Sequence, residues 1–232
     1  MEINQSIILI TSAGSVLGQT LAQHFIALGA KVLVCDADLQ ALKGTYNNCK
    51  PQDNPIEYFH IKDNDSQTIH RIYDYSQLQF DDIPDVLVNN WLSSPMPLLS
   101  NNAGDLNHIN HPFIDQLATM AKGLFHFGQI GAERMLLNNK KGVIINVISH
   151  EDHHNLSGVE NATSMVTGFT HSWAKELSPF NIRVGGVIPA LTNTDTHVEP
   201  SHWAEIQDEL IRSTEYIVSN EYFNGRVVTA EI

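Results

Sequence analysis

The hydrophobic positions along the chain follow two patterns that alternate almost from end to end. Short continuous runs of aliphatic residues predict strands buried on both faces of a sheet. These runs cover residues 6–11, 31–35, 56–61, 85–89, 142–148, 183–188 and 226–229. Between them, apolar residues spaced three or four positions apart predict amphipathic helices. The helical segments cover residues 17–28, 39–45, 65–78, 112–137, 158–178 and 200–212.

This alternation of strands and helices is typical of a doubly wound α/β fold. We therefore expect one domain over residues 1–232, with a mostly parallel, seven-stranded, Rossmann-type sheet and helices on both faces. Ligands of such sheets bind at the carboxyl ends of the strands. Residues 93–110 are rich in Ser, Pro, Asn and Gly, which predicts a long loop after the fourth strand.

Composition and charge exclude several classes of partner. The formal net charge of −13 would repel a polyanion, so we do not expect nucleic acid to bind. No signal peptide and no apolar run of about 20 residues is found, so we expect no membrane association. Cys35 and Cys49 match neither a disulfide framework nor a zinc site. They predict reduced thiols in a cytoplasmic protein without a structural metal.

Candidate chemistry lies where strands end. A turn rich in small residues, Thr11 to Gly18, joins the first strand to the first helix and would aim backbone N–H groups at a phosphate. Asp36 ends the second strand, and the fourth strand continues into Asn89-Asn90. The fifth strand ends at Ser149.

These motifs, in this order, resemble the short-chain dehydrogenase/reductase family. Further matching segments extend the resemblance over nearly the whole chain; they are Gly168–Leu177, Asn181–Val184, Val187–Pro189 and Asn224–Val228. The resemblance implies an oxidoreductase that uses NAD(H), because an acid at position 36 would bind the ribose hydroxyls and repel a 2′-phosphate. The cofactor-binding residues that it implies are Thr11, Ser12, Ser15, Leu17, Gly18, Asp36, Ile61, Asn89, Pro189 and Thr194.

The chain departs from the family pattern within this cofactor site. Ser12 and Val16 replace two glycines of the turn, and a valine side chain would keep the backbone away from a pyrophosphate. His60 replaces the aspartate usually found near the adenine. Trp91 stands where the resemblance implies a small residue at the floor of the nicotinamide pocket. These departures leave open whether NAD(H) binds at all.

The catalytic residues of the family are also largely missing. Of the four positions only Ser149 is kept, while Val159, Thr163 and Met120 occupy those of the tyrosine, the lysine and the relay asparagine. The segment from Ser149 to Ala174 contains no Tyr and no Lys that a shifted alignment could use. General acid–base catalysis requires a tuned proton donor within hydrogen-bond reach, so losing it should cost several powers of ten in rate.

Three hypotheses follow from these losses. The first is a family homologue without the usual dehydrogenase activity, which binds NAD weakly or acts as a binding or structural subunit. The second is an active oxidoreductase whose acid comes from the cluster His150 to His154, with His153 and His154 as candidates. A nucleophile pair of Ser149 with His150 or His153 is a further option. That cluster is equally typical of a solvated loop. The third is a nucleotide sensor or a scaffold.

The resemblance also implies a homodimer or homotetramer. In the family, the helices matching residues 112–137 and 158–178 form the subunit interface. Here they carry Phe125, Phe127, Phe169 and Trp173, more large apolar groups than one face accommodates easily. Packing of these groups in the core of a single chain is the alternative. Residues 200–212 resemble a substrate lid, and a short surface helix is the alternative.

Overall fold

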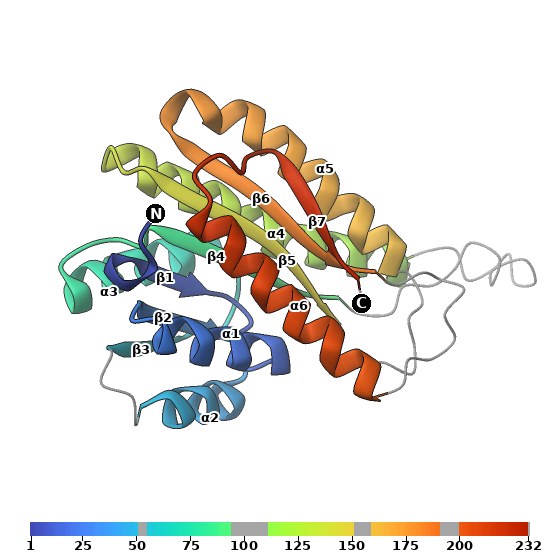
Figure 1. Cartoon of the computed structure of the whole chain (residues 1–232), viewed down its shortest axis with the longest axis horizontal. Coiled ribbons are helices and arrows are strands. Elements are labelled where there is room, and N and C mark those ends of the chain that lie inside the picture. Colours follow the sequence, from blue (N-terminus) through green and yellow to red (C-terminus); the bar gives the residue numbers. More distant parts are fainter. Residues whose placement is uncertain (51–54, 94–110, 151–158, 191–199, 232) are drawn as a thin grey trace, which may run out of the picture.

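The computed structural model describes residues 1–50, 55–93, 111–150, 159–190 and 200–231. A seven-stranded sheet with the order β3-β2-β1-β4-β5-β6-β7 forms its centre, and every neighbouring pair is parallel (Figure 1). The strands are β1 (Ile7–Ile10), β2 (Lys31–Asp36), β3 (Ile56–His60), β4 (Val86–Ser93), β5 (Gly142–His150), β6 (Ile182–Pro189) and β7 (Arg226–Ala230). The predicted doubly wound α/β architecture is confirmed.

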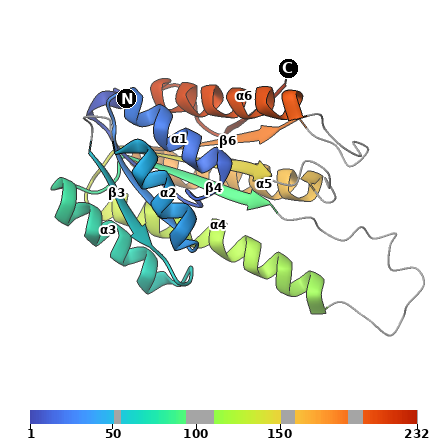
Figure 2. The same ribbon diagram turned by 90° about the horizontal axis from the view of Figure 1, so that it is seen from below.

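Helices cover both faces of this sheet. The helices are α1 (Val16–Ala27), α2 (Leu39–Cys49), α3 (Ser66–Phe80), α4 (His111–Leu137), α5 (Val159–Leu177) and α6 (Pro200–Ser219). Buried side chains of α1, α2 and α6 share one hydrophobic cluster together with Val159 at the start of α5, and those of α3, α4 and the rest of α5 share the other. Figure 2 shows α1 and α6 on one side of the sheet, and α3 and α4 on the opposite side.

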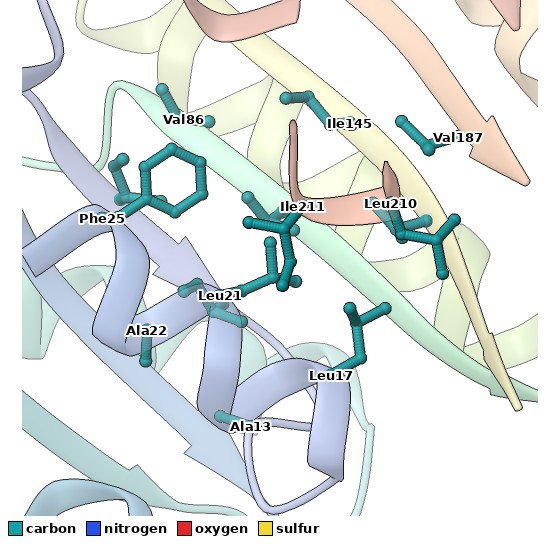
Figure 3. Close-up of a cluster of buried hydrophobic side chains, with 14 of the residues drawn as sticks. Ala13, Leu17, Leu21, Ala22, Phe25, Val86, Ile145, Val187, Leu210 and Ile211 are labelled. Carbon is teal, nitrogen blue, oxygen red and sulfur yellow. The ribbon is translucent and has the colours of Figure 1, made fainter. Parts of the chain in front are cut away.

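The two clusters explain why the strands are continuous apolar runs. Successive side chains of a strand point to opposite faces. Ile8 and Ile10 therefore pack towards α1, whereas Leu9 packs towards α3 and α4. Figure 3 shows side chains of α1 and α6 meeting over the central strands, among them Leu17, Leu21, Phe25, Leu210 and Ile211. Full burial of each large aliphatic side chain contributes about 1.5–3 kcal/mol.

Two strands extend well beyond the hydrophobic runs that predict them, and α2 continues four residues past its predicted end, to Cys49. β4 continues to Ser93 and β5 to His150, although the apolar runs end at residues 89 and 148. The added residues are mostly polar, yet Asn90, Ser93, Ser149 and His150 are all buried. A polar residue interrupts the apolar pattern whether it faces solvent or a polar site, so the pattern could not locate these ends.

The expectation of a lid or surface helix at residues 200–212 was wrong. Helix α6 continues to Ser219 and packs on the sheet, with Trp203, Ile206 and Leu210 in the core. Its apolar face persists through Ile217 and Val218, which the prediction ended too early to include. None of the described helices has the length and apolarity required to cross a membrane.

Candidate functional site

A cavity of about 270 Å³ opens at the carboxyl ends of β1, β2 and β4. In the strand order, β1 lies between β2 and β4, so this is the point where the chain switches direction across the sheet and where ligands of doubly wound folds bind. Five of the predicted cofactor residues line it: Thr11, Ser12, Asp36, Ile61 and Asn89. The topology thus brings together residues from four separate segments.

The turn between β1 and α1 forms one wall. Ser15 caps α1, since its Oγ accepts a hydrogen bond from the Gly18 N–H (3.1 Å) and donates one to the Ser12 carbonyl (2.7 Å). A Cβ on Gly18 would come within 2.5 Å of the Ser12 oxygen, so only glycine fits. Ser12 itself has a φ of 46°, a left-handed conformation that favours glycine. The turn keeps its shape although two of its glycines are replaced.

Asp36 is fixed at the end of β2 by backbone donors. Its Oδ2 accepts a hydrogen bond from the Gly14 N–H (2.8 Å), and its Oδ1 accepts one from the Asp38 N–H (2.9 Å). Each carboxylate oxygen has a second lone pair, so the group still has capacity to accept hydrogen bonds from a ligand. His60, in place of the expected aspartate, lies with its Nε2 3.0 Å from the Ala37 carbonyl. Its ring is thus engaged by the loop after β2.

The two asparagines at the end of β4 play different parts. Asn89 donates from Nδ2 to the Leu124 carbonyl (2.9 Å) and to Asn146 Oδ1 (3.3 Å), which links β4 to α4 and β5. Asn90 donates from Nδ2 to the Ser12 carbonyl (3.2 Å) and to Ser15 Oγ (3.1 Å), which anchors the turn. Asn90 Oδ1 is buried and has no hydrogen-bond partner among the described residues. Asn90 therefore presents an unused acceptor in a residue that lines the cavity.

Sequence reasoning missed part of the cavity wall. Asn64 follows β3, and a Cβ on Gly123 of α4 would come within 3.1 Å of Asn64 Nδ2. The prediction placed Phe127 at a subunit interface, but its ring is buried against the sheet and lines the cavity with Leu124. The only available signal was the helical periodicity of α4, which does not indicate which face meets the sheet.

Two large side chains stand where the family pattern has small ones. Trp91 is only 7% exposed and lines the cavity beside Leu92. Val16 is the first residue of α1, and its side chain is 54% exposed. The helix start, where a pyrophosphate would approach the backbone, therefore carries a branched apolar side chain.

The positions that the resemblance assigns to the catalytic tyrosine and lysine lie on α5 and carry no proton-transfer group. Val159 is fully buried in the core. Thr163 donates from Oγ1 to the Val159 carbonyl at 2.9 Å, one turn earlier in the helix. Met120 lies within α4, but its side chain is outside the described part. Val159 and Thr163 cannot reproduce the chemistry of Tyr and Lys.

Ser149 lies near the end of β5, where the resemblance implies the catalytic serine. It is buried, and its Oγ has no hydrogen-bond partner among the described residues. His150 is the last residue of β5 and is 1% exposed, so its assignment to a solvated loop was wrong. Its Nδ1 lies 3.0 Å from Ser93 Oγ, and its ring packs edge-on against Trp203. His150 therefore pairs with Ser93 of the neighbouring strand, not with Ser149.

The remaining predicted residues lie away from the cavity or outside the described segments. Leu17 points into the core, so only its backbone could contact a ligand there (Figure 3). Pro189 ends β6 and is paired in register with Ala230 of β7. His153, His154 and Thr194 lie outside the described residues. Among the described residues, no three His, Cys, Asp or Glu side chains gather as metal ligands would.

A glycine-containing turn, a strand-end carboxylate and a strand-end asparagine lie around one switch-point cavity, which is the arrangement of a Rossmann-type α/β fold. Residues 6–205 match the sequence pattern of the short chain dehydrogenase family, and the chain belongs to this family. It is 26% identical to zerumbone synthase of Zingiber zerumbet, covering 97% of this chain and 83% of that protein. It is 24% identical to (3R)-3-hydroxyacyl-CoA dehydrogenase of Canis lupus familiaris, covering 84% and 76%.

Solved structures agree with this fold. A short chain dehydrogenase from Bacillus anthracis superimposes with a TM-score of 0.77 at 18% identity, covering 98% of this chain and 95% of that one. A 3-ketoacyl-(acyl-carrier-protein) reductase from Brucella melitensis, complexed with NADH, superimposes with a TM-score of 0.73 at 18% identity, covering 98% and 97%. At these identities the likeness concerns the fold alone.

Proposed function

We propose that this chain is a short-chain dehydrogenase homologue that binds a nucleotide or nucleoside but lacks the usual dehydrogenase turnover, and that it acts as a binding or structural protein. The observation that carries the proposal is the pair Val159 and Thr163 on α5. A valine holds no proton, and the hydroxyl of Thr163 is already bonded to the helix backbone. Neither group supplies the tuned acid that hydride chemistry on a carbonyl requires.

NAD(H) is the cofactor that the family resemblance implies, and the residues present fit only one half of it. Asp36 would hold the ribose hydroxyls of the adenosine half, beside the apolar wall of Ile61 and Phe127. The pyrophosphate and nicotinamide half meets Val16 and Trp91 instead of small residues. A partial fit supports weak binding or none, and it supports no reaction step that runs through the cofactor.

A second candidate function is an oxidoreductase with a different proton donor. The observation in its favour is the buried pair formed by Ser93 and His150, whose Oγ and Nδ1 lie 3.0 Å apart. His150 follows Ser149 directly in the chain, at the carboxyl ends of the strands, where the family carries out its chemistry. In this candidate His150 would hold the proton that the missing tyrosine supplies elsewhere.

One experiment separates the two candidates. Purified protein is assayed for NADH and NADPH oxidation with ketones and aldehydes, and for NAD⁺ reduction with alcohols. We expect turnover at least about a thousandfold below that of an active relative, because the general acid and its partner residue are missing. Robust turnover would overturn the proposal. If His150→Ala abolishes such turnover while His171→Ala, at an exposed position of α5, retains it, the second candidate is correct.

We also propose a homodimer formed through α4 and α5. A groove of about 410 Å³ runs between these helices and is lined by Phe125, Leu136, Leu137 and Trp173, among others. Phe125 is 40% exposed and Leu137 is 70% exposed, although both are large and apolar. A second copy of the chain, with the same groove related by a two-fold axis, would cover them. The chain belongs to a family in which the matching helices form the subunit interface, and this supports the proposed dimer.

A further inference from the structure

We propose that the cavity at the ends of β1, β2 and β4 selects a neutral nucleoside over a dinucleotide. This inference rests on the proposed function and names the ligand class of that site. It starts from size. The cavity volume of about 270 Å³ falls below the roughly 300–1,000 Å³ that is typical of sites for drug-sized molecules. A site of this size matches a base with its ribose better than two linked nucleotides.

Charge is the second argument. Asp36 is the one charged group among the described residues that line the cavity, and Lys, Arg and His do not occur in that lining. A phosphate would therefore meet a carboxylate without a compensating cation, in a chain of formal net charge −13. A neutral ligand avoids this repulsion.

The polar groups in the cavity indicate what the ligand must present. The carboxylate of Asp36 and the unpartnered Oδ1 of Asn90 are both hydrogen-bond acceptors. The Asp36 carboxylate keeps lone pairs beyond those used by the Gly14 and Asp38 N–H groups, so it favours a ligand that brings hydroxyl donors. The hydroxyls of a ribose are such donors, whereas phosphate oxygens are only acceptors at neutral pH.

The remaining wall suits a flat, largely apolar ring with polar edges. Ile61, Leu124 and Phe127 are buried and present apolar surface. The side-chain amide of Asn64, which both donates and accepts, lies in the same wall beside Gly123. A nucleobase combines these two properties, because its faces are apolar and its edges form hydrogen bonds.

Two large side chains, Val16 and Trp91, replace the small residues that the family pattern has beyond the ribose site. At the start of α1, the Gly18 N–H is already bonded to Ser15 Oγ, and the side chain of Val16 projects from the first turn. The helix terminus thus offers a phosphate fewer backbone donors and a steric obstacle. Towards β5, the indole of Trp91 forms the cavity wall.

Isothermal titration of the full chain with adenosine, AMP and NAD⁺ tests the inference. We expect adenosine to bind at least tenfold more tightly than AMP or NAD⁺. Asp36→Asn should weaken adenosine binding by about tenfold, because the charged acceptor is lost while the shape is kept. The exposed Leu78→Ala on α3 serves as the control and should change nothing.

Opening the obstructed side gives the complementary test. Val16→Gly should raise NAD⁺ affinity at least tenfold while changing adenosine affinity less than threefold. Val16→Ala, which retains good helix propensity, guards against a folding defect. Tighter binding of NAD⁺ than of adenosine by the wild type, or no binding of adenosine, would overturn the inference. Neither result bears on the proposed lack of turnover, which fails only if the enzyme assay is positive.

Discussion

At the scale of single residues, two buried polar atoms of the sheet edge stand apart. Asn90 Oδ1 and Ser149 Oγ have no partner among the described residues, whereas the side chains of Asn89, Asn146 and Thr170 bond to one another. Sequence reasoning could select Ser149, because a serine ending an apolar strand is visible in the pattern. It could not assign a role to Asn90, because the contacts of this side chain form only in the folded chain. One of them is the hydrogen bond from Asn90 Nδ2 to Ser15 Oγ, which joins residues 75 positions apart.

Tyr75 leads to a prediction about pH. Its hydroxyl donates to Glu57 Oε2 at 2.9 Å, and partial burial together with this hydrogen bond raises its pKa from 10.0 to about 12. The protonated phenol therefore stabilises the fold fully below pH 10, and this contribution is lost as the pH rises from about 10 to about 12. We expect Tyr75→Phe to lower the free energy of unfolding by about 1 kcal/mol at pH 8 and by less at pH 11, measured by urea denaturation.

The control for this prediction is Tyr222→Phe, because Tyr222 is 91% exposed. Its stability difference from the wild type should be small and independent of pH. A difference for Tyr75→Phe that stayed constant or widened towards pH 11 would contradict the assignment.

At the scale of elements, the sequence predicted the seven strands and six α-helices of the described segments, because the inner strands are buried on both faces and each helix is buried on one face. The larger errors fall at the carboxyl ends of α2, β4 and β5 and at α6. At the two strand ends, buried polar residues such as Ser93 and His150 imitate a loop. In α6, the apolar face that marks a core helix resembles that of a lid, and only contact with β5, β6 and β7 distinguishes the two.

The contact between α4 and α5 depends on one glycine. A Cβ on Gly128 would lie 2.4 Å from the ring of Trp173, which in turn stacks on Phe169 at 5.1 Å. We expect Gly128→Ala to destabilise the protein by about 1–3 kcal/mol through overpacking, although alanine favours helices. In a Trp173→Leu background the same change should be neutral or stabilising, which a double-mutant cycle by thermal denaturation would measure.

Gly168 on α5 is the matched control, since a Cβ there meets nothing within 4 Å. Gly168→Ala should raise stability by up to about 1 kcal/mol. Equal destabilisation by both glycine substitutions would mean that helix packing is not the cause.

At the scale of the whole molecule, the sheet and its two helix layers follow the fold of the family. The residues that depart from the family pattern lie mainly at the carboxyl ends of the strands. The sequence indicated this region because the α/β alternation predicts a doubly wound sheet, whose ligands bind at the carboxyl ends of the strands. It could not identify Asn64 and Phe127 as parts of one cavity, since 63 residues separate them and only the folded sheet brings them together.

The same scale carries the prediction of a dimer. We expect sedimentation equilibrium to give twice the chain mass of 25.8 kDa. Replacing Phe125 and Leu136 by Glu should produce a folded monomer, because two carboxylates in each groove would have to be desolvated. Tyr222→Ser, at an exposed position away from the groove, should remain dimeric. A monomeric wild type would refute the assignment, and a mass of four chains would require a second interface.

The indole of Trp91 has an optical consequence. The chain has three tryptophans, and of these only Trp91 lies in the cavity wall, while Trp173 packs between helices and Trp203 contacts His150. A ligand that enters displaces water from one indole and leaves the other two unchanged. The emission wavelength and quenching of that single fluorophore thus report occupancy directly, so that libraries of unlabelled compounds can be screened in a plate reader without any assay of turnover.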